Sequence, residues 1–226
     1  VGVKSIIKGE KLVGNSDRYS YASNSFVNDP FAVYDYSYKE QVYSAYGTVG
    51  QELGKFKYQV GFRGEYAVQS PTLKSQDIAV TKEYFNLYPS AHLRYALKEK
   101  SELSLSYSRR VNRPSSQDLN PFTNYADPYN LRSGNPYLNP EYINSFDLGY
   151  TQQIKKVTIT SSIYYRETRD AITRVKRFTS DNTATVTMDN VARNQVTGLE
   201  LVLQVRPTSW WRNTLSFDGS YIVFTN

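Results

Sequence analysis

Hydrophobic and polar residues alternate along most of the chain. From Lys55 to Tyr66 the even positions carry aromatic residues, valine and glycine, whereas the odd positions carry charged residues, glutamine and glycine. Successive side chains of an extended strand point to opposite faces, so this segment predicts a β-strand with one apolar and one polar face. An amphipathic helix would need apolar residues three and four positions apart, and that spacing is missing here.

The same alternation recurs at intervals and predicts an all-β protein: an antiparallel up-and-down meander of about nine strands, without a helix of convincing length. Val202 interrupts one of these patterns because an apolar residue stands at a polar position. The further strands are expected at Phe85–Leu97, Glu102–Ser108, Ser145–Thr151, Val157–Arg166, Leu199–Arg206 and Thr214–Val223, with weaker ones near Val1–Leu12 and Gln41–Gln51.

The connections between these strands alternate between short and long. Short ones are expected at Glu52–Lys55, Lys98–Lys100, Gln153–Lys156 and Pro207–Trp210. Long ones are expected at about Val13–Lys39, Ala67–Glu83, Val111–Glu141 and Glu167–Asn194. Outer-membrane barrels have short periplasmic turns and longer extracellular loops, whereas a soluble Greek-key sandwich has no reason to keep this order. The alternation of short and long connections therefore indicates that the chain forms part of a large transmembrane β-barrel.

The last of these long connections itself has the sequence of a strand over much of its length. Val157–Phe178 and Thr183–Arg206 are predicted to form one long hairpin that turns at Ser180-Asp181-Asn182. Each arm of roughly 20 residues would extend about 65 Å. Because the hydrocarbon layer is only about 30 Å thick, the tip of the hairpin is expected to project into water.

Composition supports this interpretation and removes several classes of function. The 226 residues include 21 tyrosines, yet the mean hydropathy is −0.58, as expected when only alternate residues face lipid. A soluble β-sandwich is also compatible with composition alone. Cysteine is absent and His92 is the only histidine, so we expect no metal, no cofactor and no enzymatic activity. The net charge of +6 is scattered, which argues against nucleic-acid binding.

The segment Arg109–Glu141 is the most distinctive part of the sequence. Its prolines at 114, 121, 128, 136 and 140 prevent a regular strand. One interpretation is a rigid loop that packs on itself. The other is a binding surface for a sugar-like or peptide-like ligand, formed by Arg110, Arg113, Phe122, Tyr125, Asp127, Tyr129, Arg132 and Tyr137.

Two phrases of this region, YSRRVNRPSSQDLNPF and YADPYNLRSGNPYLNPEYINSFDLGY, with the later VARNQVTGLEL, resemble the outer-membrane β-barrel family of TonB-dependent receptors in Gram-negative bacteria. The resemblance extends roughly from Tyr43 to Tyr221. It implies an outer-membrane location, a plugged barrel of the 22-stranded kind and import of a scarce nutrient ligand. The implied partners are outer-membrane lipid, a plug domain, a TonB-type energy-coupling protein and a small, unidentified ligand. The resemblance assigns no ligand residue.

Both ends of the chain, at Val1 and Asn226, have the sequence of a strand interior. We therefore expect residues 1–226 to be a single partial β-barrel domain, internal to a longer protein that also carries the plug. The polar faces would line the lumen or contact that plug, and Trp210 and Trp211 would belong to an interfacial girdle. Two alternatives remain open: a soluble all-β module that binds carbohydrate, and a structural outer-membrane barrel without transport.

Overall fold

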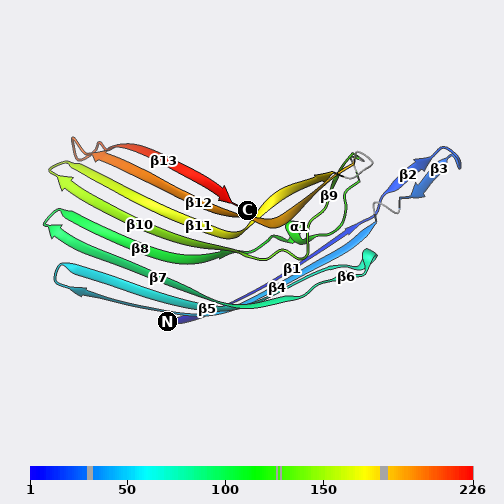
Figure 1. The fold of residues 1–226 in the computed structure, drawn as a ribbon, viewed down its shortest axis with the longest axis horizontal. Coiled ribbons are helices and arrows are strands. Elements are labelled where there is room, and N and C mark those ends of the chain that lie inside the picture. Colours follow the sequence, from blue (N-terminus) through cyan, green and yellow to red (C-terminus); the bar gives the residue numbers. More distant parts are fainter. Residues whose placement is uncertain (30–32, 126, 128, 179–182, 226) are drawn as a thin grey trace.

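Nine long strands form one curved sheet in the computed structural model, which describes residues 1–29, 33–125, 127, 129–178 and 183–225 (Figure 1). Each strand pairs antiparallel with its neighbours along the sequence, so the predicted up-and-down meander is confirmed. The strands are β1 (Gly2–Gly14), β4 (Tyr34–Leu53), β5 (Phe56–Leu73), β7 (Lys82–Lys98), β8 (Ser101–Asn112), β10 (Glu141–Ile154), β11 (Val157–Phe178), β12 (Ala184–Val205) and β13 (Asn213–Thr225).

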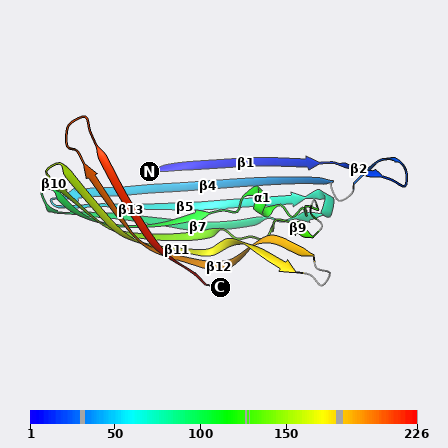
Figure 2. The same cartoon turned by 90° about the horizontal axis from the view of Figure 1, so that it is seen from above.

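The short turns lie at one end of the sheet and the long connections at the other (Figures 1 and 2). The long connections carry small elements of their own. They are the hairpin β2 (Asp17–Ser20) and β3 (Ser25–Asn28), the 3₁₀ turn η1 (Lys74–Gln76), β6 (Ile78–Ala79), the single helical turn α1 (Ser116–Leu119) and β9 (Asn130–Arg132). Within the described part of the chain, no helix is both long and apolar enough to cross a membrane.

The register of the strands divides the sheet into a polar face and an apolar face. Two adjacent rows show the division: Ser44, Glu65 and Asn86 on the polar face, and Tyr43, Tyr66 and Phe85 on the apolar face. The register also places these polar side chains of β5, β7, β8, β10 and β12 on that polar face: Lys57, Arg63, Glu65, Arg94, Glu102, Asp147, Glu200 and Gln204. The predicted alternation therefore holds from strand to strand.

Large side chains remain exposed on the apolar face. Phe62 is 51 % exposed, Leu148 is 46 % exposed and Phe217 is 60 % exposed. Contiguous apolar surface of this kind is rare on soluble monomers and is the expected outer surface of a transmembrane barrel. Trp210 and Trp211, with rings 6.2 Å apart, are exposed in the short connection between β12 and β13, where an interfacial girdle would place them.

Several strands extend further than their alternation predicts. β5 reaches Leu73, so the connection expected at Ala67–Glu83 is reduced to residues 74–81, and β4 begins at Tyr34 inside the expected first loop. Val202 lies opposite Thr160 without a shift of register, so it is an apolar residue on the polar face rather than an interruption. Beyond Tyr66 the residues of β5 no longer alternate between polar and apolar, which hides its extension, whereas Tyr34, Tyr36 and Tyr38 of β4 do alternate with polar residues.

The long hairpin is confirmed by β11 and β12, whose bounds match the predicted arms within one residue. Its predicted turn at Ser180-Asp181-Asn182 lies outside the described residues. The register shifts between Thr168 and Ile172, where Asp170 adopts a left-handed conformation with φ of 55°. Asn190 donates to the Asp170 carbonyl at 2.7 Å and thereby stabilises this bulge, which separates the membrane part of the arms from their tip.

A separation between β7 and β8 creates room for the longest connection. The two strands pair only from Ser90 and Ser108 toward their short turn. Beyond that point β7 pairs only with β5, and β8 only with β10. The chain that follows β8 lies against the polar face of β4 and β5, where its leucines complete the buried cluster Tyr36, Tyr38, Leu73, Leu119 and Leu138.

Candidate ligand-binding site

The loop between β8 and β10, residues 113–140, is built around α1. Ser115 caps this turn because its hydroxyl accepts a hydrogen bond from the Asp118 backbone N–H at 3.2 Å, while the Asp118 carboxylate accepts from Ser115. This reciprocal arrangement is a capping box. It points Leu119 into the buried cluster, where Tyr36 donates to the Ser116 carbonyl at 2.8 Å.

An ion pair attaches the start of the loop to the sheet. The Arg113 guanidinium lies 2.6 Å from the Glu65 carboxylate, and the two side chains are only 17 % and 8 % exposed. Glu65 also contacts Arg63 at 3.4 Å. Burial alone would lower the pKa of Arg113, but the hydrogen bond and charge of Glu65 outweigh it and raise that pKa above its ordinary value. Arg113 therefore remains a cation bound to the sheet.

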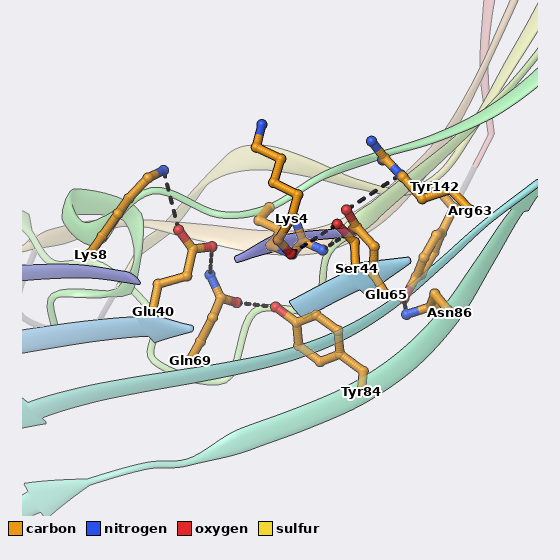
Figure 3. Close-up of polar contacts among 11 residues, drawn as sticks. Lys4, Lys8, Glu40, Ser44, Arg63, Glu65, Gln69, Tyr84, Asn86 and Tyr142 are labelled. Atoms are coloured by element: carbon orange, nitrogen blue, oxygen red, sulfur yellow. Dashed lines mark hydrogen bonds and ion pairs between the residues drawn. The ribbon is translucent and has the colours of Figure 1, made fainter. Parts of the chain in front are cut away.

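A second set of polar contacts continues along the same face (Figure 3). Gln69 is buried and donates to the Tyr38 hydroxyl at 2.8 Å and to Glu40 at 3.4 Å. Lys8 pairs with the other side of Glu40 at 3.3 Å, and Tyr84 donates to the Gln69 amide oxygen. These contacts join the four strands β1, β4, β5 and β7 beneath the loop and support the surface on which it packs.

The far end of the loop is held by Lys82 at the start of β7. Its ammonium donates to the Leu138 carbonyl at 2.9 Å, to the Asn139 side chain at 2.9 Å, and to the Tyr137 carbonyl. Three acceptors from consecutive residues match the three donors of an ammonium group. Both ends of the loop are thus fixed by cations, and the interpretation as a packed, rigid loop is supported for its framework.

The structure separates the eight residues predicted to bind a ligand into two groups. Arg113 contacts Glu65, Phe122 stacks on Tyr34 with ring centroids 4.4 Å apart, and Asp127 accepts hydrogen bonds from the backbone of Tyr129 and Asn130. These contacts stabilise the loop itself. Asp127 is itself exposed, as are Arg110, which lies in β8 and not in the loop, and the loop residues Tyr125, Tyr129, Arg132 and Tyr137.

Only two of the eight, Phe122 and Arg132, line the same cleft. This open cleft of about 410 Å³ lies between the loop and the distal arms of β11 and β12. Its lining also includes Arg174 and Met188, which the sequence did not indicate. The alternation of side chains along β11 assigns Arg174 to one face of that strand. Only the pairing of β11 with β12, and its register, show that this face lines the cleft. Within the described residues, no group of acidic or histidine side chains could hold a metal ion.

Comparison with known proteins assigns the wall a family. Residues 1–226 match the outer membrane protein beta-barrel family. The chain belongs to this family. It is therefore an outer-membrane protein of Gram-negative bacteria, and the soluble carbohydrate-binding module considered from the sequence is ruled out. No characterised protein gives a significant match to the sequence itself.

Solved structures of other outer-membrane barrels share this fold. The copper transporter OprC is 17 % identical with a TM-score of 0.71, and the match covers 97 % of this chain and 34 % of that one. The Serratia marcescens hemophore receptor HasR, solved with its hemophore HasA and heme, is 13 % identical with a TM-score of 0.71, covering 97 % and 42 %. The Escherichia coli K12 ferric-catecholate import receptor Fiu is 11 % identical with a TM-score of 0.64, covering 99 % and 35 %. This outer-membrane chain thus spans between a third and a half of their length.

Proposed function

We propose that residues 1–226 form part of the barrel wall and the extracellular loops of a TonB-dependent outer-membrane receptor that imports a nutrient ligand. The observation that carries this proposal is the loop 113–140. It folds over the polar face at the end of the wall where the long connections gather, in a chain whose fold is shared with transporters and import receptors.

In this proposal the wall is one domain, internal to a longer protein. The nine strands leave β1 and β13 as the end strands of the sheet, and further strands would close the barrel between them. The polar face would contact a plug domain, and a TonB-type protein would supply energy through that plug. The eight predicted loop residues remain our candidates for ligand contact: Arg110, Arg113, Phe122, Tyr125, Asp127, Tyr129, Arg132 and Tyr137.

The cargo classes of the similar structures give the first substrates to test: copper, heme and ferric catecholates. Uptake of each would be measured in cells that carry the intact protein, in cells that lack it, and in cells where residues 116–137 are replaced by a short Gly-Ser linker. Each strain would be compared with and without its TonB-type protein.

We expect uptake of one cargo to fall in all three defective backgrounds, while the linker variant and the cells without the TonB-type protein keep the normal amount of the protein in the outer membrane. Equal amounts of the linker variant would show that the wall still assembles. Uptake that depends on neither the loop nor the energy-coupling protein would contradict the proposal and favour a structural barrel without transport.

A further inference from the structure

Three cations share one face of the small sheet formed by the distal arms. β9 runs parallel to β12 with Arg132 opposite Val186, and β11 runs antiparallel to β12 with Arg174 opposite Met188 and Lys176 opposite Val186. The contact between the Lys176 ammonium and the Asn130 side chain at 3.0 Å bridges β11 and β9 across this face. The register therefore brings basic side chains from two separate segments to the same side.

Two carboxylates lie near these three cations: Asp118 in the lining of the cleft, and Asp127, whose pKa the charge of Arg132 helps to lower. Among the described residues, the guanidinium groups of Arg132 and Arg174 make no ion pair and no hydrogen bond. Asp118, the one carboxylate among the described residues that line the cleft, accepts both hydrogen bonds of Ser115. Asp189 pairs with Arg177 at 3.0 Å on the opposite face of the arms. With two guanidinium groups and one carboxylate in its lining, the cleft keeps an excess of one positive charge.

The floor of the cleft is apolar and firmly supported. Phe122 and Met188 both pack against the buried cluster of Tyr36, Leu119 and their neighbours. Gln117 and Asn120 also line the cleft. Small-molecule sites are typically concave, with an apolar lining and a few polar groups, and measure about 300–1,000 Å³; at about 410 Å³ this cleft falls within that range.

We propose that this cleft binds a small organic oxyanion, a carboxylate or a phosphate ester, whose apolar part lies on Phe122 and Met188. Guanidinium groups bind both oxyanions through paired, charge-assisted hydrogen bonds. Arg132 and Arg174 would approach the anion from the two sides of β12. The inference rests on the proposed function in one respect: it names the chemical class of ligand that the extracellular loops take.

Calorimetric titration of the intact outer-membrane protein in detergent micelles tests the proposal. The probes are phenyl phosphate, benzoate and inorganic phosphate, with benzyl alcohol as the neutral comparison. We expect phenyl phosphate to bind more tightly than inorganic phosphate because only the former covers the apolar floor. We expect benzyl alcohol to bind far more weakly than either anion that carries a ring, and binding of the anions to weaken as salt is raised.

Substitutions then locate the site. Arg132→Gln and Arg174→Gln should each weaken phenyl phosphate binding about tenfold, the effect of losing one charged hydrogen bond. Phe122→Leu should reduce the preference for phenyl phosphate over inorganic phosphate and leave inorganic phosphate binding unchanged. Arg177→Gln is the matched control, because it removes a cation from the opposite face of the same arm and should not alter binding.

No binding by phenyl phosphate or benzoate would overturn the proposal, as would equal losses in the Arg174 and Arg177 variants. Because the titration requires neither a membrane nor an energy source, its failure leaves the transport proposal intact. Conversely, anion binding without uptake of any cargo would support the cleft and count against transport.

Discussion

At the scale of single residues, the loop depends on a few charged contacts with the wall. Arg113 is the principal one because it is mostly buried and shares Glu65 with Arg63. Removing one partner of a buried ion pair leaves the other charge without compensation, which costs far more than losing a pair at the surface. Position in the fold, more than charge itself, decides the importance of each arginine.

Arg113→Met should therefore lower the free energy of unfolding of the membrane-inserted protein by about 2–4 kcal/mol. Urea titration in lipid vesicles, followed by circular dichroism, would measure it. The control is Arg177→Met, whose side chain is 67 % exposed and whose loss should cost less than about 1 kcal/mol. Equal effects of the two substitutions would show that the contact with Glu65 does not anchor the loop.

Asp127 gives the loop a pH dependence. Its hydrogen bonds, first that from the Asn130 side chain and then that from the Tyr129 backbone, lower the pKa of this carboxyl group. A depressed pKa means that the stabilisation of the turn is complete above the unfolded value of about 3.9 and is lost as pH falls through the lower, folded value. The turn should thus be fully formed at neutral pH.

The backbone amide shifts of Tyr129 and Asn130 in NMR spectra should accordingly remain constant from neutral pH to about pH 4 and change only below it. Asp127→Asn should abolish the inflection, since the amide does not titrate. An inflection above the ordinary aspartate value would contradict the contacts described for this turn.

At the scale of elements, the arms of β11 and β12 consist of two parts with different tasks. Below the bulge at Thr168–Ile172 both arms pair with neighbouring wall strands, whereas above it they pair with each other and with β9. The lower part belongs to the sheet and the upper part to the proposed cleft. The upper part of β11 carries three cations, Arg174, Lys176 and Arg177, whereas its lower part alternates apolar and polar residues, as expected for a strand with lipid on one face.

Replacing residues 174–188, which lie between the paired residues Thr173 and Asp189, by a two-residue Asn-Gly turn should leave the barrel folded and remove the cleft. Tight hairpin turns of this type suit the twist of antiparallel strands. The expected result is unchanged heat-dependent mobility in gel electrophoresis together with loss of phenyl phosphate binding. A variant that fails to insert into the outer membrane would show instead that the upper arms are required for the wall.

The sequence predicted the wall better than the site, for a physical reason. Alternation along β5, between Lys55 and Tyr66, directly records a strand with lipid on one side, so the strands, their order and the long hairpin were accessible. The site depends on contacts between residues far apart in sequence. The contact between Arg113 and Glu65 depends on the path of the loop across the sheet. Arg132 lies on the same face as Met188 because of the register in which β9 and β11 pair with β12. No local sequence pattern encodes either arrangement.

At the scale of the whole molecule, one face of the sheet is apolar over its full width while the other is charged and carries the loop. The rows extend across neighbouring strands without interruption; Leu105, Leu148, Ile163 and Leu199 form one of them. Such a surface is stable only against lipid, because exposed contiguous apolar area is costly in water. We therefore expect this face to lie against the lipid of the outer membrane.

Spin labels on single cysteines along β5 test that claim most directly, and the chain contains no cysteine of its own. Labels at Tyr58, Val60 and Phe62 should be relaxed by lipid-soluble oxygen, whereas labels at Lys57, Gln59 and Arg63 should not, which gives a period of two residues. We expect this alternation in the intact protein reconstituted in bilayers. Equal accessibility of both sets to a water-soluble nickel chelate, with no preference of either set for oxygen, would contradict it.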